Sequence, residues 1–292
     1  MLARLAIALV LVAAVAVVAS GQNGAATEDG ERLTVVATTT QAADLARNVG
    51  GGEVEVIGLL APNADPHDYE VRPHDLQALA EADLVVRSGG DVDEWLQDAI
   101  EGAGSDAPVL TLIDHVRARP GDPHWWQDPR NAIAAVAAIE QALGTDAADY
   151  RARLERLDRA VAACIAKVPP ARRKLVTTHD ALAYYAGRYD IDVVGAVIPS
   201  LSTRGQPSAG ETAELVRTIR EHDVRAIFAE SSVEAKVERA IARETGAVVG
   251  RPLWADTLGP PGSSGATYVD SIAANTRALV GGFTGGRTSC DV

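Results

Sequence analysis

The sequence predicts an α/β protein of two lobes, each with parallel-sheet βαβ units, joined by one long rigid helix. Short apolar strand-like runs alternate with helical patterns in both halves of the chain, and this alternation is typical of βαβ units. One long amphipathic pattern separates the halves. Side chains that could bind a metal follow strands in both halves. Because ligands bind at the carboxyl ends of strands in open α/β sheets, we expect a metal site in the cleft between the lobes.

Residues 1–20 have the composition of a secretory signal peptide. Arg4 is their only charged residue, Leu5–Val18 is a continuous apolar run, and Ala19-Ser20-Gly21 offers small residues for cleavage. The run is short for a membrane span, so we expect an exported chain, in the periplasm or associated with the cell surface. An uncleaved N-terminal anchor is the alternative. Residues 21–31 are polar and rich in glycine and are expected to form a flexible leader.

The first lobe is expected to span residues 32–145. Strands are predicted from short β-branched and aliphatic runs, and helices from apolar residues three or four positions apart. Gly50-Gly51-Gly52 is expected to end the first helix. The predicted strands are Leu33–Thr38, Val54–Leu60, Leu84–Arg87 and Val109–Leu112, and the predicted helices are Gln41–Val49, Pro73–Ala82, Glu94–Ile100 and Pro129–Leu143.

Residues 146–169 are expected to form the connecting helix. The apolar positions fall three or four apart from Tyr150 to Val168, with charged residues between them, and Pro169-Pro170 stops the pattern. Such a helix would have more than twenty residues. It would resist bending far more than a pair of strands, so we expect the lobes to move little relative to each other.

The second lobe is expected to span residues 170–292 and to repeat the same alternation. Ser208 is expected to cap one of its helices. The predicted strands are Lys174–Thr178, Val193–Val197, Ala226–Ala229 and Val248–Val249, and the predicted helices are Ala181–Arg188, Ser208–Glu221, Val233–Thr245 and Ala266–Val280.

The composition limits the classes of function. Hydrophobic residues make up 47% of the chain, which is enough for folded cores, and the net charge of −13 argues against nucleic acid as a partner. The sequence contains no glycine-rich nucleotide loop and no nucleophile elbow.

We expect a monomer. Cys164 and Cys290 are the only cysteines, and in an exported protein they could form one disulfide or remain two thiols.

Three histidines and one aspartate are the candidate metal ligands: His67, His124, His179 and Asp256. Three imidazoles and a carboxylate complete the coordination shell of a divalent transition metal, and neutral imidazoles suit Zn²⁺. His115 is a rival because it is close in sequence to His124.

Each candidate has another interpretation when it is taken alone. His67 could cap a turn, His124 could stack against the tryptophans beside it, and His179 could cap a helix or act as a general base. Asp256 could cap a helix or lie in a turn. Their common position after strands favours a joint site. Glu70 and Asp180 are candidates either for carboxylates that hold ligating histidines or for helix caps.

Five segments together resemble the metal-specific solute-binding proteins of bacterial ABC uptake systems, the zinc- and manganese-binding group. The resemblance runs from about Leu33 to the end of the chain. The segments are Pro66-His67-Asp68-Tyr69-Glu70, His124-Trp125-Trp126-Gln127-Asp128-Pro129, Thr178-His179-Asp180-Ala181 with Tyr184-Tyr185, Ile198-Pro199-Ser200-Leu201-Ser202-Thr203 with Pro207-Ser208-Ala209, and Ala255-Asp256-Thr257-Leu258-Gly259.

The resemblance implies metal binding between two lobes by His67, His124, His179 and Asp256. It also implies an ABC permease as the direct partner and a cytoplasmic ATPase as an indirect one. The third ligand is typically histidine in zinc binders and often glutamate in manganese binders, so His179 favours Zn²⁺, with Mn²⁺ as the alternative cargo. A zinc-dependent hydrolase and a surface adhesin are rival functions.

The chain departs from the family pattern at four places. The region after the apolar run has no cysteine for a lipid anchor, which many relatives carry, so we expect a free protein or another tether. The segment before His124 has only His115, so a metal-gathering histidine-rich loop is absent. Gln127 and Gln206 stand where the family often has an apolar and an acidic residue.

Overall fold

A four-stranded parallel sheet forms the first half of the structure. The computed structural model describes residues 32–292, so the predicted signal peptide and leader lie outside the described residues. The strand order is β2-β1-β3-β4, and every pair in it is parallel. The strands are β1 (Leu33–Ala37), β2 (Val54–Gly58), β3 (Leu84–Arg87) and β4 (Val109–Thr111).

Helices cover both faces of this sheet. Val35 and Ala37 pack in one core cluster with α1 (Thr40–Gly50) and α4 (Pro129–Leu143). Val36, which points to the opposite face, packs with α2 (Pro73–Ala80) and α3 (Leu96–Ala103). Burial on both faces explains why the strands read as apolar runs instead of alternating apolar and polar residues.

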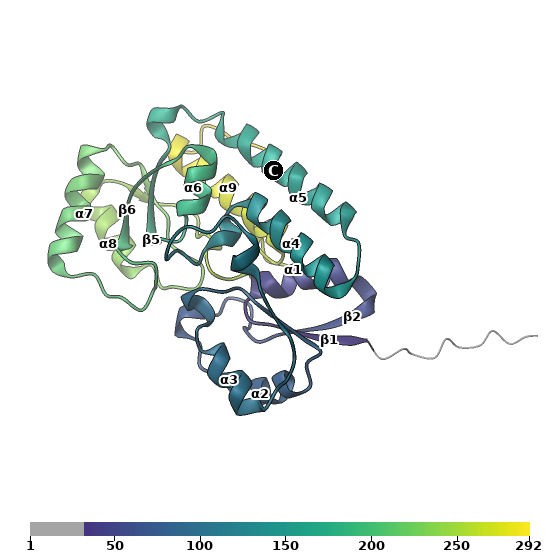
Figure 1. Cartoon of the computed structure of the whole chain (residues 1–292). Coiled ribbons are helices and arrows are strands. Elements are labelled where there is room, and N and C mark those ends of the chain that lie inside the picture. Colours follow the sequence, from purple (N-terminus) through teal and green to yellow (C-terminus); the bar gives the residue numbers. More distant parts are fainter. Residues whose placement is uncertain (1–31) are drawn as a thin grey trace, which may run out of the picture. The chain divides into compact units, whose positions relative to one another are not determined.

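The long helix α5 (Ala148–Ile165) follows and is shorter than the sequence predicted, with 18 residues. At its start, the Asp146 side chain accepts the backbone N–H of Ala148 at 2.9 Å and so caps the helix from outside. At its end, Lys167 and Val168 lie in a tighter turn, because a residue that precedes proline disfavours helical dihedrals. α5 packs against α4 and against α9 (Tyr268–Thr284), along the upper edge of the fold in Figure 1.

The second half contains two parallel strand pairs. β5 (Lys174–His179) pairs with β6 (Asp192–Ile198), and β7 (Ala226–Ile227) pairs with β8 (Val248–Val249). A bridge between Thr177 and Phe228 joins the two pairs. The remaining helices are α6 (Ala183–Tyr189), α7 (Ala209–Glu221) and α8 (Lys236–Thr245). The predicted α/β class with parallel sheets is confirmed.

One hydrophobic core runs through both halves. Val35 of β1, Leu154 of α5, Tyr185 of α6 and Phe228 after β7 belong to the same buried cluster. The boundaries of the two predicted lobes therefore stay a prediction. A shared, close-packed core transmits strain and resists deformation, so the halves are held together by more than the connecting helix.

Cys164 of α5 is bonded to Cys290 near the end of the chain. Their Cα atoms are 5.6 Å apart, and the bridge closes 126 residues of sequence. The disulfide that the sequence left open is thus present in the structure. No helix within residues 32–292 has the length and apolar character needed to cross a membrane.

We predict that Cys290→Ser lowers the free energy of unfolding by about 2–4 kcal/mol, because the cross-link restricts a long loop of the unfolded chain. Denaturant unfolding of the metal-free protein measures the change. Ser289→Ala, an exposed neighbour in the same segment, is the control and should leave the transition unchanged. Equal unfolding midpoints for the two variants would contradict the prediction.

Candidate metal centre

The structure brings His67, His124, His179 and Asp256 together. His67 lies in the short 3-10 helix η2 (Pro66–Asp68) after β2, and His124 precedes η5 (Trp125–Gln127) after β4. His179 is the last residue of β5, and Asp256 lies in the loop after β8. Each residue offers one ligand atom, and these atoms all lie within 4.8 Å of one another. All four residues are buried. They come together because each lies at or after the carboxyl end of a strand.

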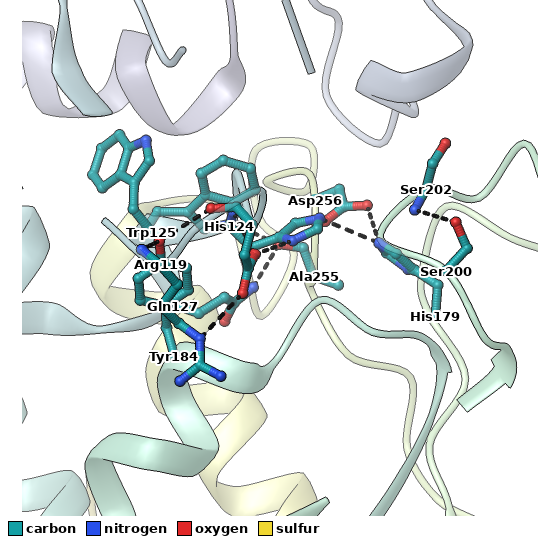
Figure 2. Close-up of polar contacts among 12 residues, drawn as sticks. Arg119, His124, Trp125, Gln127, His179, Tyr184, Ser200, Ser202, Ala255 and Asp256 are labelled. Carbon is teal, nitrogen blue, oxygen red and sulfur yellow. Dashed lines mark hydrogen bonds and ion pairs between the residues drawn. The ribbon is translucent and has the colours of Figure 1, made fainter. Parts of the chain in front are cut away.

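The ligand atoms face one another closely and lack other partners. Nε2 of His124 lies 3.3 Å from Nε2 of His179. The Asp256 carboxylate lies 3.1 Å from Nε2 of His179 and 3.5 Å from Nε2 of His67 (Figure 2 shows His124, His179 and Asp256). Among the described residues, neither Asp256 oxygen nor Nε2 of His67 has a hydrogen-bond partner. Unsatisfied buried polar atoms are costly, and a divalent cation at this point would satisfy them.

Two buried carboxylates set which nitrogen of each histidine faces the centre. Asp122 lies 2.8 Å from Nδ1 of His124, and Glu230 lies 2.6 Å from Nδ1 of His179. A carboxylate holds the proton on Nδ1, so Nε2 is left with a lone pair for a metal. These carboxylates are not the ones that the sequence suggested. Glu70 is exposed, and Asp180 is bonded through its backbone N–H to the carbonyl oxygen of Ser200.

The tripeptide Asp-Pro-His occurs twice and forms the same local turn at two of the candidate ligands. Asp65 accepts the backbone N–H of His67 at 2.9 Å, and Asp122 accepts that of His124 at 3.0 Å. Aspartate side chains favour such turns, and the intervening proline restricts the backbone. The other carboxylate oxygen of Asp65 accepts the hydroxyl of Thr203 at 2.6 Å, which ties the turn to the second half of the chain.

The loop that carries Asp256 is held against the segment that carries His124. The Ala255 carbonyl accepts Nε1–H of Trp126 at 2.9 Å and Nε2–H of Gln127 at 2.6 Å (Figure 2 shows the contact of Gln127). Gln127 is one of the departures from the family pattern. Its amide makes a contact that an apolar side chain could not make, so this departure strengthens the link between the two halves.

Charge interactions outweigh burial in setting the pKa values of Asp256 and His179. Burial alone would raise the pKa of Asp256, but the charges of His179 and His124 hold it well below its usual value. Burial alone would lower the pKa of His179, but Asp256 and Glu230 raise it well above its usual value. Burial raises the pKa of Glu230. The metal-free centre therefore favours a proton on His179, and a cation that binds this imidazole would displace that proton.

The other histidines do not join this group. His74 is exposed and lies 3.1 Å from the Asp75 carboxylate. His222 caps the end of α7, and the rival His115 ends the short helix η4 (Leu112–His115) on the surface.

Comparisons with known proteins agree with the geometry. The family model described as zinc-uptake complex component A, periplasmic (ZnuA), matches residues 35–282. The manganese-binding lipoprotein MntA of Bacillus subtilis is 33% identical over 93% of this chain and 96% of its own length. The zinc-binding protein TroA of Treponema pallidum is 31% identical over 87% of this chain and 90% of its own length. The solved structure of TroA covers 86% of this chain and 99% of its own, with a TM-score of 0.79 and 26% identity.

We predict that Asp122→Asn and Glu230→Gln each weaken zinc binding by about ten- to a hundredfold, as loss of a carboxylate behind a ligating histidine does in other sites. Isothermal titration calorimetry measures the affinity. Asp114→Asn and Glu234→Gln remove exposed carboxylates nearby and are the matched controls. Affinities within twofold of the unsubstituted chain for the first pair would contradict the assigned roles.

The raised pKa of His179 predicts a pH dependence. Above the ordinary value of 6.5 and below the raised pKa, the folded metal-free chain holds a proton that the unfolded chain has lost. This contribution to stability is complete below 6.5 and is lost as the pH rises through the folded pKa. Zinc displaces the same proton, so zinc affinity should rise by up to about tenfold per pH unit in that window.

Calorimetry in buffers of different ionisation enthalpy should detect about one proton released per zinc in this window. His222→Gln changes an exposed histidine and should leave the release unchanged. Zinc affinity that does not vary with pH would contradict the raised pKa of His179.

Proposed function

The chain belongs to the zinc-uptake complex component A family, and from this premise we propose that it captures a zinc ion outside the cytoplasm and delivers it to an ABC permease. The proposed ligands are His67, His124, His179 and Asp256. The observation that carries the proposal is the buried cluster of their four ligand atoms, all within 4.8 Å of one another. An ATPase on the cytoplasmic side would drive transport through the permease.

The donor set supports zinc as the cargo. Three imidazole nitrogens and one carboxylate match the ligands and the number of ligands that Zn²⁺ takes, whereas Mn²⁺ favours oxygen donors. The names of the relatives include both a manganese-binding and a zinc-binding protein, so the names do not identify the metal that this chain binds. Manganese is the second candidate, because the MntA relative is 33% identical to this chain.

Capture fits the arrangement better than catalysis. Catalytic zinc sites have three protein ligands and keep a fourth position open for water. Here a fourth protein donor, Asp256, lies among the imidazoles and is fully buried. The relatives named above are binding proteins and not hydrolases.

Release would then require a local opening of the centre. Asp65 holds both the His67 turn and, through Thr203, the loop of the second half. Arg204 in the same loop lies 3.8 Å from Glu94 of the first half. Loss of these contacts on docking to the permease would withdraw His67 from the ion while the shared core stays intact.

We predict that the metal-free chain binds one zinc ion and that manganese displaces it only at large excess, because affinity for nitrogen-rich sites is higher for Zn²⁺ than for Mn²⁺. Native mass spectrometry of the titrated chain measures both. His124→Ala should abolish tight binding, and His74→Ala, an exposed histidine, should not. Tighter binding of manganese than of zinc would favour the second candidate.

Delivery is tested in the native host. A strain that lacks the chain should accumulate less zinc under chelation, and the wild type and His74→Ala should restore zinc accumulation whereas His124→Ala should not. Unchanged zinc content with a fall in manganese content would contradict zinc delivery.

A further inference from the structure

A cavity lies near the metal centre and contains none of the proposed ligands. Its volume is about 710 Å³, and its walls come from the segment before His124, from α4 and from α6. Four arginines line it, namely Arg117, Arg119, Arg130 and Arg188. The chain as a whole has a net charge of −13. The cavity lining is therefore positively charged on a protein that is negatively charged overall.

The guanidinium groups are incompletely paired. Among residues 32–292, no carboxylate forms an ion pair with the Arg117 side chain. Nε of Arg188 is buried and has no hydrogen-bond partner within the same part of the chain. Arg130 and Arg188 share the single carboxylate of Asp158, at 3.4 Å and 2.8 Å. The Arg117 guanidinium therefore offers unused N–H donors, and Arg130 and Arg188 have only one carboxylate between them.

Only one carboxylate lies in the described lining of the cavity. Asp128 caps α4 and accepts the backbone N–H of Arg130 at 2.9 Å. Arg119 lies 3.6 Å from Asp122, with about half of its side chain exposed. Four guanidinium groups are thus set against three carboxylates, those of Asp122, Asp128 and Asp158. This leaves an excess of positive charge at the cavity.

We propose that this cavity binds a small polyanion, a molecule with two or more carboxylate or phosphate groups. Arginine presents a planar fork of donors that matches both groups bidentately. The volume is in the range of small-molecule sites and far exceeds what one inorganic oxyanion fills. Arginines from three separate segments would engage more than one anionic group at once.

The cavity adjoins the metal centre through Arg119 and Tyr184. The Tyr184 hydroxyl donates to the Asp122 carbonyl at 3.0 Å and accepts the backbone N–H of Arg119 at 2.6 Å (Figure 2 labels Arg119 and Tyr184). Asp122 in turn holds His124. A polyanion bound to Arg119 would therefore be linked to the proposed metal ligand His124 through Asp122, which contacts both residues.

Isothermal titration calorimetry of the metal-free full chain with citrate and with pyrophosphate tests the proposal, and acetate at matched ionic strength is the monovalent control. The metal-free chain keeps the result independent of the proposed metal function. We expect one polyanion per chain and weak or undetectable binding of acetate. The polyanion that binds with the higher affinity shows whether the cavity prefers carboxylate or phosphate groups.

Arg117→Ala should weaken the binding by about tenfold, because one charge-assisted contact is lost. Arg130→Ala should have a similar effect. Arg243→Ala removes the same charge from the exposed surface of α8 and should change the affinity by less than about twofold. The absence of saturable binding of both polyanions, or equal weakening by Arg117→Ala and Arg243→Ala, would overturn the proposal.

Discussion

The structure depends on the burial of three imidazoles and one carboxylate around a single point. Two Nε2 atoms lie 3.3 Å apart, and both oxygens of Asp256 have no hydrogen-bond partner among the described residues. Without a cation this arrangement carries the cost of unsatisfied buried polar groups. A divalent ion at this point would remove that cost. The surrounding fold therefore stabilises a group of side chains whose favourable state includes a bound metal.

The neighbouring structure explains how these groups stay in place. Two Asp-Pro-His turns fix His67 and His124, and Asp122 and Glu230 orient His124 and His179. Trp126 and Gln127 bind the loop of Asp256 from the other half of the chain. Each ligand is thus held by a contact that does not involve the metal, as a preorganised site requires.

Local signals in the sequence predicted most of the elements. The bounds of α4 match the prediction because Pro129 and Gly144 mark its start and end, and Ser208 caps α7 as expected. The length of α5 was overestimated because its apolar periodicity continues into a turn before proline. The four candidate ligands were singled out because each follows a predicted strand; the structure brings them together, and their binding of a metal stays a prediction.

Contacts between residues far apart in the chain could not be predicted from the sequence. Glu230 lies 51 residues from His179 and comes after a different strand, so no local pattern links the two. Asp122 could have been found from its place two residues before His124. The shared core was also missed, because an amphipathic pattern shows which face of a helix is buried but not what covers it. That core limits how far the two halves can separate around the ion.

The proposed function depends on one zinc ion held by His67, His124, His179 and Asp256. X-ray absorption at the zinc edge, on the chain loaded with one equivalent, tests it most directly. We expect a four-coordinate ion with three imidazole nitrogens and one carboxylate oxygen, at about 2.0–2.2 Å. The signature of one imidazole should be lost in His179→Ala. A shell with fewer than three imidazoles in the unsubstituted chain, or no change in the variant, would contradict the claim.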